Sequence, residues 1–340
     1  MGFERYWYVV AESREIGAQV VLSRRLLGRH LVVFRNADGK PVILQDRCLH
    51  RCGKLSMGRI VGQGKLQCPY HGWLYDGEGT VVSIPSEGGE KAARKRRLRS
   101  QPIASREQDG FVFACLKPAD SKMEPFAMPH FAERGWRHVR LRNCFGNTVT
   151  NCVENFIDIP HTIFVHPKIF RRSENRPLTA RVRRRGDVVE VDYEGEERNL
   201  GTFSWFLNPR RLRVEHRDSF FAPNVTHVRY DIGGKTLFIT SHSVPLDDEE
   251  TLVYTDLTWR FGFWTPFVGW LVRRQARKVI NQDIRVLNDQ MDVLRSSGRQ
   301  FIDTPADRIH TLVTEIREAI EADRDPSELP EREFAVEFYV

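Results

Sequence analysis

The first third of the chain alternates short apolar runs with polar turns. Two of these runs, residues 30–34 (HLVVF) and 110–115 (GFVFAC), have the length and the β-branched and aromatic content of strands. Turn sequences such as Asn-Ala-Asp-Gly at 36–39 separate the runs. Residues 1–120 are therefore predicted to form a small antiparallel β domain, which ends in a polar, proline-containing connection at 118–129.

The remaining residues, 121–340, are predicted to form a second domain of α+β type. It should contain strands at 188–193, 225–230, 236–243 and 251–261. A helix is expected from Arg273 to Leu294, because apolar residues recur there at three- to four-residue intervals. These residues are Ala276, Ile280, Leu287, Met291 and Leu294. A last helix is predicted near 311–322.

The apolar stripe of the long helix has one gap, and an acid fills it. Asp283 lies on the stripe, whereas Asp289 and Asp292 lie off it. A carboxylate that points into a core is costly unless it is paired or bound to a metal. Asp283 is therefore a candidate metal ligand, and a solvated helix face accounts for the other two.

Length and composition exclude several classes of protein. The 340 residues and 41% apolar content suit two domains with real cores. Residues 1–10 lack the apolar stretch of a signal peptide, and the longest apolar run, 261–272, is too short to span a bilayer. We expect a cytoplasmic protein without a membrane span, in which the six cysteines are ligands or free thiols.

The net charge of +7 is concentrated in clusters at 91–99, 181–185, 210–213 and 273–278. No aromatic platform or recognised nucleic-acid-binding fold accompanies them, so nucleic acid is not an expected partner. Most such runs are solvated faces.

Two mixed Cys/His pairs carry the most specific chemistry. Cys48-Leu49-His50 is followed after seventeen residues by Cys68-Pro69-Tyr70-His71-Gly72-Trp73. In a Rieske [2Fe–2S] cluster two thiolates hold one iron and two imidazoles hold the other. A structural zinc site uses the same ligands but usually pairs Cys with Cys and His with His, and is the alternative.

At these residues the sequence resembles the oxygenase component of Rieske non-heme iron oxygenases. Respiratory-type Rieske proteins carry two extra cysteines in a disulfide, whereas Tyr70 stands at one of those positions here. Cys52 is then expected to be a free, buried thiol. The resemblance implies a second domain of helix-grip type, an antiparallel sheet wrapped on a long helix around a cavity.

A second metal site is predicted from the segment 154–166 (ENFIDIPHTIFVH). His161 and His166 could approach each other if Pro160 bends the segment. With an acid from elsewhere they would form the two-histidine, one-carboxylate set of non-heme iron enzymes. Asp283 is the expected acid, also because the segment around it resembles the carboxylate-bearing segment of smaller Rieske oxygenases, and Asp289 is the runner-up.

The resemblance also assigns roles to two neighbours of these histidines. Asp158 would bridge His161 and the cluster ligand His71 of an adjacent subunit, in a ring-shaped homotrimer. Placed three residues before His161, it would share a helix face with it, although a capping or surface role is the alternative. Asn155 matches an asparagine often found near the iron.

The implied function is that of a terminal oxygenase that uses O₂. The chain has no flavin, nicotinamide or plant-type ferredoxin motif, so a partner reductase, with or without a ferredoxin, must relay electrons from NAD(P)H. The hypothesis for the basic run 91–99, which follows His71 closely in the sequence, is that it steers this donor, which would then be acidic. Monooxygenation, either hydroxylation or O- or N-demethylation, is the expected reaction. The alternatives are a cis-dihydroxylating dioxygenase and a Rieske electron-transfer protein without oxygenase activity.

An aromatic cluster precedes the long helix. Its members are Phe261, Phe263, Trp264, Phe267 and Trp270, with Trp205 and Phe206 earlier in the chain. Such clusters usually pack in a core. The functional alternative is an apolar pocket, or its entrance, for an aromatic or polycyclic substrate.

Overall fold

The computed structural model describes residues 2–120, 123–167, 169, 177–194, 208 and 210–339. The chain divides into two units, Glu4–Ala127 and Met128–Val340, and the second also includes Met1–Phe3. The sequence placed this boundary slightly earlier, between residues 120 and 121.

Three small antiparallel sheets make up the N-terminal unit. They have the strand orders β1-β10-β9, β2-β3-β4 and β5-β6-β7-β8. The strands are β1 (Tyr8–Glu12), β2 (Leu22–Leu26), β3 (Arg29–Arg35), β4 (Pro41–Gln45), β5 (Arg59–Val61), β6 (Lys65–Gln67), β7 (Leu74–Tyr75), β8 (Val81–Ser83), β9 (Ala104–Gln108) and β10 (Phe111–Cys115). Helix α1 (Glu90–Arg96) follows the third sheet.

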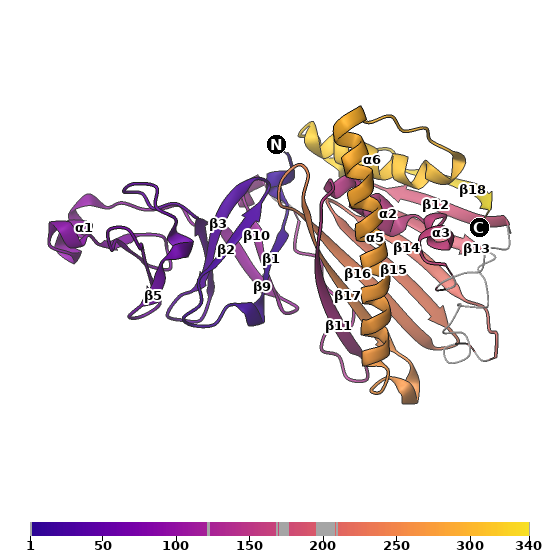
Figure 1. The fold of residues 1–340 in the computed structure, drawn as a ribbon, viewed down its shortest axis with the longest axis horizontal. Coiled ribbons are helices and arrows are strands. Elements are labelled where there is room, and N and C mark those ends of the chain that lie inside the picture. Colours follow the sequence, from indigo (N-terminus) through magenta and orange to yellow (C-terminus); the bar gives the residue numbers. More distant parts are fainter. Residues whose placement is uncertain are drawn as a thin grey trace. The chain divides into compact units, whose positions relative to one another are not determined.

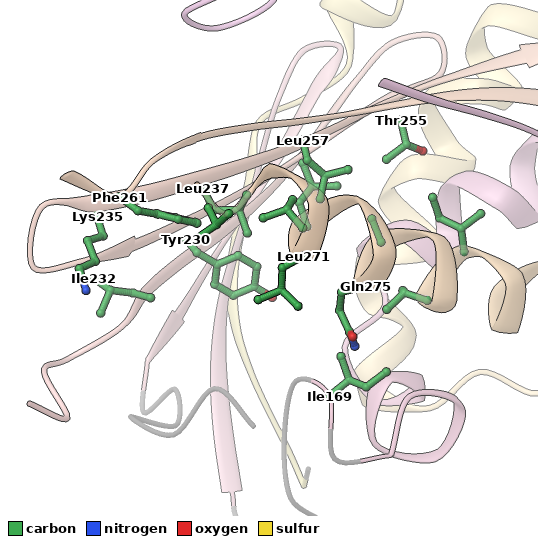
Figure 2. Close-up of a pocket in the computed structure, with 16 residues that line it drawn as sticks. Ile169, Tyr230, Ile232, Lys235, Leu237, Thr255, Leu257, Phe261, Leu271 and Gln275 are labelled. Atoms are coloured by element: carbon green, nitrogen blue, oxygen red, sulfur yellow. The ribbon is translucent and has the colours of Figure 1, made fainter. Parts of the chain in front are cut away.

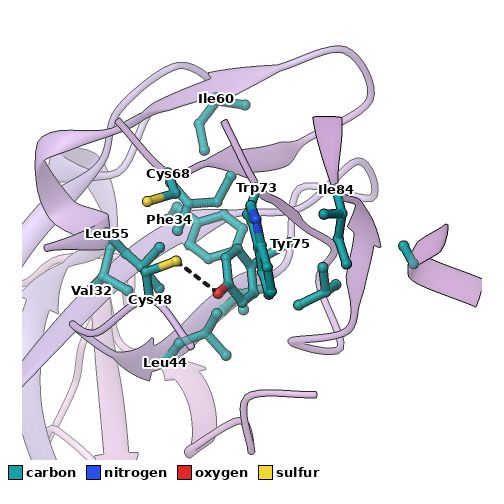
Figure 3. Close-up of a cluster of buried hydrophobic side chains, with 14 residues drawn as sticks. Val32, Phe34, Leu44, Cys48, Leu55, Ile60, Cys68, Trp73, Tyr75 and Ile84 are labelled. Carbon is teal, nitrogen blue, oxygen red and sulfur yellow. Dashed lines mark hydrogen bonds between the residues drawn. The ribbon is translucent and has the colours of Figure 1, made fainter. Parts of the chain in front are cut away.

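A buried cluster joins the second and third sheets beneath the Cys/His loops. Phe34 and Leu44 of β3 and β4 lie in the same cluster as Leu66 and Tyr75 of β6 and β7 (Figure 3). Cys48 and Cys68 also belong to this cluster, so the two loops start from one common core.

The second unit is built on one antiparallel sheet of eight strands, in the order β11-β17-β16-β15-β14-β13-β12-β18 (Figure 1). The strands are β11 (Arg137–Phe145), β12 (Pro177–Arg185), β13 (Val188–Glu194), β14 (Glu215–Phe221), β15 (Val225–Ile232), β16 (Lys235–Pro245), β17 (Thr251–Arg260) and β18 (Arg332–Tyr339). The helices are α2 (Val149–Ile157), α3 (His161–Val165), α5 (Gly269–Ser297) and α6 (Arg308–Glu321).

The long helix α5 crosses one face of this sheet (Figure 1). Its buried residues Ile280 and Leu287 pack with Leu141 of β11 and with Val253 and Leu257 of β17. Asp283 is buried on the same stripe, with 5% of its surface exposed. The α+β class, the antiparallel sheet and the long helix are therefore confirmed, and the helix extends beyond both predicted ends.

Several elements of the second unit were not predicted from the sequence. They include helix α2 and strands β11, β12, β14 and β18. In β11 only Leu141 and Phe145 are buried, and in β12 one of the four alternating buried positions is Arg184, so the apolar signal of both strands is weak. Their strand conformation depends on the ladders that β17 and β18 form with them, and residues distant in sequence supply those ladders.

Candidate metal centres and substrate cavity

The two Cys/His segments of the N-terminal unit fold into loops with the same backbone pattern. In the first loop the Cys48 N–H donates to the Gly53 carbonyl, and the Cys52 N–H donates back to the Cys48 carbonyl. In the second loop the Cys68 N–H donates to the Trp73 carbonyl, and the Gly72 N–H donates to the Cys68 carbonyl. Cys52 and Gly72 occupy equivalent left-handed positions, with φ of 54° and 71°. Each loop thus presents its Cys and His from a closed turn.

The two imidazoles of these loops meet at their tips. The His50 and His71 rings are in edge contact, with centroids 4.6 Å apart, and the Trp73 indole stacks on His50 at 4.9 Å. His50 Nδ1 is buried without a hydrogen-bond partner among the described residues. Desolvation lowers the pKa of His50, which favours the neutral form that binds metals.

The two thiols of the same site are buried under the loops. Burial raises the pKa of Cys68, although the backbone N–H groups of Tyr70 and His71 act in the opposite direction. The Tyr75 hydroxyl lies 3.2 Å from Cys48 Sγ and accepts the Leu49 N–H at 2.9 Å (Figure 3). A buried thiolate pair needs a cation, and an unpartnered imidazole nitrogen needs a ligand. These residues therefore fit an iron–sulfur cluster.

Cys52 corrects one prediction. It is free, as expected, but exposed, not buried. The reason is its place in the first loop, where the left-handed backbone directs its side chain away from the core that holds Cys48. Tyr75, which contacts Cys48, and Trp73 were not identified as supporting residues from the sequence.

In the second unit the structure brings His161, His166 and Asp283 together. One potential ligand atom from each residue lies within 4.8 Å of the others. Asp283 Oδ1 is 3.0 Å from His166 Nε2 and 3.7 Å from His161 Nε2. His161 begins α3, and His166 follows its last residue, so the short helix turns the two rings toward the same point of α5.

The other ring nitrogen of each histidine has an oxygen acceptor. His161 Nδ1 lies 3.0 Å from Asp158 Oδ2, and His166 Nδ1 lies 3.1 Å from Gln282 Oε1. Such contacts fix the tautomer and the ring orientation, with Nε2 left to bind a metal. Gln282 was not predicted from the sequence, although its position next to Asp283 was a usable signal.

The sequence predicted that Asp158 and His161 share a helix face, and this prediction is wrong. Helix α2 ends at Ile157, Asp158 is extended, and α3 begins at His161. The Asp158 carboxylate instead accepts the backbone N–H of His161 at 3.1 Å as well as its ring nitrogen. Pro160 is the physical reason, because its ring prevents a continuous helix.

The carboxylate of Asp283 fits a metal ligand. Its Oδ1 atom is buried and accepts no hydrogen bond from a described residue, although two imidazole nitrogens face it. An ion between these three groups would satisfy the oxygen and both nitrogens. Asp289 is exposed on α5 and is not part of this group.

Asn155 lies beside the same cavity but outside the three-residue group. Its Oδ1 atom is buried, without a hydrogen-bond partner among the described residues. The side chain lines the cavity that also contains His161 and Asp283.

The three-residue group opens into a cavity. Polar side chains from the sheet line its far side, among them His216, Asp218 and Thr226. His216 Nε2 lies 2.9 Å from Asp218 Oδ1, and the Tyr193 hydroxyl donates to Asp218 Oδ2 at 3.0 Å. This cavity therefore combines the candidate metal ligands with a buried hydrogen-bonded group.

A second, apolar pocket adjoins the first, and the two share Tyr230, Ile239, Thr255, Val279 and Ile280. Leu237, Leu257, Phe261 and Leu271 provide much of its wall (Figure 2). Lys235 is the only charged side chain among its described lining residues. The combined space suits an apolar molecule that reaches the histidines at one end.

The aromatic cluster before α5 corrects a second expectation. Phe261 is buried and lines the apolar pocket, but the other four, Phe263, Trp264, Phe267 and Trp270, are exposed. These four side chains therefore do not pack in a core and do not line the described pocket, and the alternative that they mark its entrance stays a prediction. Trp205 and Phe206 lie outside the described residues.

Two family models match the chain. Residues 6–100 match the Rieske [2Fe-2S] domain, and residues 148–322, about half of the chain, match the vanillate O-demethylase oxygenase C-terminal domain. The first match contains both Cys/His loops, and the second contains His161, His166 and Asp283.

Curated proteins and solved structures are similar over most of the chain. The phthalate 4,5-dioxygenase oxygenase subunit of Pseudomonas putida is 27% identical over 87% of this chain and 68% of its own length. The 4beta-methylsterol monooxygenase of Methylococcus capsulatus is 26% identical over 81% of this chain and 73% of its own. The structure of NdmA from Pseudomonas putida CBB5 with caffeine has a TM-score of 0.80 at 21% identity, covering 96% and 94% of the two chains.

Other curated relatives are considerably longer than the matched part. The chain spans between 26% and 35% of the length of three of them. Within the described residues, no helix has both the length and the apolar character that a membrane crossing requires.

Proposed function

The chain belongs to the Rieske terminal oxygenases, and from this membership we propose that it monooxygenates an apolar substrate. It has a Rieske [2Fe-2S] domain and a C-terminal domain of the vanillate O-demethylase oxygenase family. The observation that carries the proposal is the position of His161, His166 and Asp283 at the end of a largely apolar space. Proteins of this family contain both a Rieske cluster and a mononuclear iron.

Each residue of the site has a defined task in this proposal. His161, His166 and Asp283 would hold iron(II), and Cys48, His50, Cys68 and His71 would hold the cluster. Iron in a two-histidine, one-carboxylate set keeps open positions where dioxygen and substrate can meet. Asp158 and Gln282 orient the two imidazoles.

The walls of the cavity support an apolar substrate. The pocket shared with the histidine site is lined mainly by leucine, isoleucine, valine and aromatic side chains, which would favour an apolar molecule. The buried His216–Asp218–Tyr193 group would position a polar substituent of the substrate. An aromatic or polycyclic molecule with one polar group matches this lining.

Asp158 is proposed to connect two subunits. One of its oxygens accepts both hydrogen bonds from His161, and 19% of its side-chain surface is exposed, so the carboxylate is accessible to a second partner. By the family resemblance, that partner would be His71 of an adjacent copy in a homotrimer. An external reductase or ferredoxin would supply the electrons, because the chain contains no flavin or nicotinamide motif.

Dioxygenation is the second candidate. The phthalate 4,5-dioxygenase subunit, which aligns with 87% of this chain, favours it. The monooxygenase relative and the demethylase family of the C-terminal domain favour hydroxylation or demethylation.

A single-turnover assay tests the proposal. Chemically reduced protein is mixed with oxygen and with pools of methyl ethers, methylamines, polycyclic compounds and aromatic acids, and products are read by mass spectrometry. A gain of one oxygen atom, or loss of a methyl group with release of formaldehyde, is expected. A gain of two oxygen and two hydrogen atoms would mean dioxygenation. Turnover that survives His161→Ala would contradict the assigned site.

A further inference from the structure

Four aromatic side chains are exposed where the chain enters α5. The exposed fractions are 77% for Phe263, 47% for Trp264, 66% for Phe267 and 70% for Trp270. Phe263 contacts Trp264 and Phe267, with ring centroids 5.5 and 5.6 Å apart, so these three side chains form one patch, and Trp270 follows them on the first turn of α5. Contiguous exposed apolar patches are uncommon on monomeric proteins and usually mark an interaction surface.

A basic run follows the aromatic patch directly. Arg273, Arg274, Arg277 and Lys278 are all exposed on the first turns of α5, and the Arg274 guanidinium lies 5.4 Å from the centre of the Trp270 ring. Residues 261–282 contain no Asp or Glu. Among the described residues, no carboxylate forms an ion pair with any of these four side chains. The surface is therefore both apolar and strongly positive.

We propose that residues 263–278 bind the surface of an anionic lipid bilayer. Trp and Phe side chains prefer the boundary between headgroups and acyl chains, and neighbouring Lys and Arg side chains are attracted to anionic headgroups. Both elements of such an interfacial site are adjacent here. Binding of this kind lies on the membrane and does not require a spanning helix.

The patch is continuous with the apolar pocket. Phe261, Val268 and Leu271, which come from the same segment, line that pocket. Figure 2 shows Phe261 and Leu271 in its wall. A bound bilayer would therefore bring lipid-dissolved molecules close to the pocket wall. This link to substrate supply rests on the proposed function, whereas the binding of lipid does not depend on it.

Vesicle flotation tests the proposal with the full-length protein loaded with its cluster. Vesicles of phosphatidylcholine mixed with phosphatidylglycerol should carry the protein to the top of the gradient, and pure phosphatidylcholine vesicles should carry much less. Each basic residue removed is expected to weaken binding about fivefold, so Arg273→Gln with Arg277→Gln should weaken it about 25-fold. Phe263→Ser with Phe267→Ser should reduce binding to both kinds of vesicle by tenfold or more, on the order of what burial of one large apolar side chain contributes.

Two matched controls separate this surface from general effects. Lys91→Gln with Lys95→Gln removes the same charge from an exposed basic run of the N-terminal unit, and Ile302→Ser removes an apolar side chain that is 92% exposed. Both variants should bind vesicles like the unmodified protein. Equal weakening by the control pair would mean that net charge alone attracts the protein, and would overturn the proposal.

The remaining outcomes also give a decision. No binding to anionic vesicles overturns the proposal. If Phe263→Ser with Phe267→Ser changes the sedimentation coefficient without affecting vesicle binding, the patch is an interface between copies of the chain, and the proposal is again overturned. Vesicle binding without any product in the single-turnover assay would leave the lipid surface standing and count only against the proposed reaction.

Discussion

At the residue scale, the candidate iron site is defined by how each histidine uses its two nitrogens. Nε2 of both rings faces Asp283 Oδ1, and Nδ1 of both rings contacts an oxygen, from Asp158 or Gln282. The rings are therefore oriented by the protein before any ion binds. This preorganisation lowers the cost of assembling the site.

Asp283→Asn should abolish iron binding in the second unit and lower turnover about a hundredfold or more, because an amide supplies no negative charge to the ion. Iron analysis should then show only the cluster iron, with its visible spectrum unchanged. Asp289→Asn, an exposed change on the same helix, is the control and should retain full activity. Loss of activity in the control alone would transfer the role to Asp289.

Gln282→Leu should weaken iron binding and activity by about 10- to 100-fold, because His166 loses the acceptor that orients its ring. Gln282→Glu keeps an oxygen at that position and should restore most of both. Iron titration and steady-state turnover check this together. Equal activity of the Leu variant and the unmodified protein would show that the contact does not position His166.

At the element scale, α5 performs two tasks with one stripe of residues. Ile280 and Leu287 pack on β11 and β17, and Asp283 lies between them facing the histidines of α3. A helix that is anchored by packing on both sides of its ligand holds that ligand with little freedom. The central strands β15 and β16 contribute buried polar groups as well.

Two histidines of these strands, the buried His242 and the partly buried His227, should make folding sensitive to acid. Burial lowers the pKa of His242 to about 3 and that of His227 to about 4. In the unfolded chain both histidines bind a proton near pH 6.5, whereas in the folded chain they do so only below the lowered pKa values. The free energy of unfolding is therefore full at neutral pH and decreases as the pH falls below about 6.5. At pH 5 each histidine should lower the free energy of unfolding by about 2 kcal/mol.

His242→Leu checks this expectation, because it removes one of these two proton acceptors. Denaturant unfolding at neutral and mildly acidic pH should show a smaller loss of free energy of unfolding in this variant. The quantity to compare between the variant and the unmodified protein is the difference in free energy of unfolding between neutral and mildly acidic pH. An unchanged difference would mean that His242 does not contribute to acid sensitivity.

At the scale of the whole molecule, the charges are distributed unevenly between local pairs and open surface. In the basic run 91–99, Arg94, Arg96 and Arg99 pair with Glu90, Glu87 and Glu78. These surface pairs contribute little to stability and leave several of the positive charges of the run unpaired. The hypothesis that this run steers an acidic electron donor stays a prediction.

Reduction of the cluster by its donor should therefore slow as ionic strength rises. Replacing Lys91 and Lys95 by Gln should lower the association rate and flatten its salt dependence, which stopped-flow measurement of cluster bleaching can follow. The Arg210→Gln, Arg213→Gln pair provides the charge-matched control. A rate that does not depend on salt would exclude steering by this run.

The sequence by itself predicted both candidate metal sites of this protein. Cys48, His50, Cys68 and His71 lie in two short segments, and the spacing within each segment sets the local loop that presents these candidate ligands. The period of the apolar residues in α5 identified Asp283 as an acid directed into a core, since helical spacing determines which residues share a face.

Only the tertiary structure decided how distant segments combine. The packing of α5 on the sheet brings Gln282 to His166, and the shared core under the loops brings Tyr75 to Cys48. Pro160 placed Asp158 outside the helix of His161, and the exposed aromatic patch before α5 could not be distinguished from core by its composition. Burial and long-range contacts depend on which surfaces the fold leaves uncovered, and no local pattern encodes that choice.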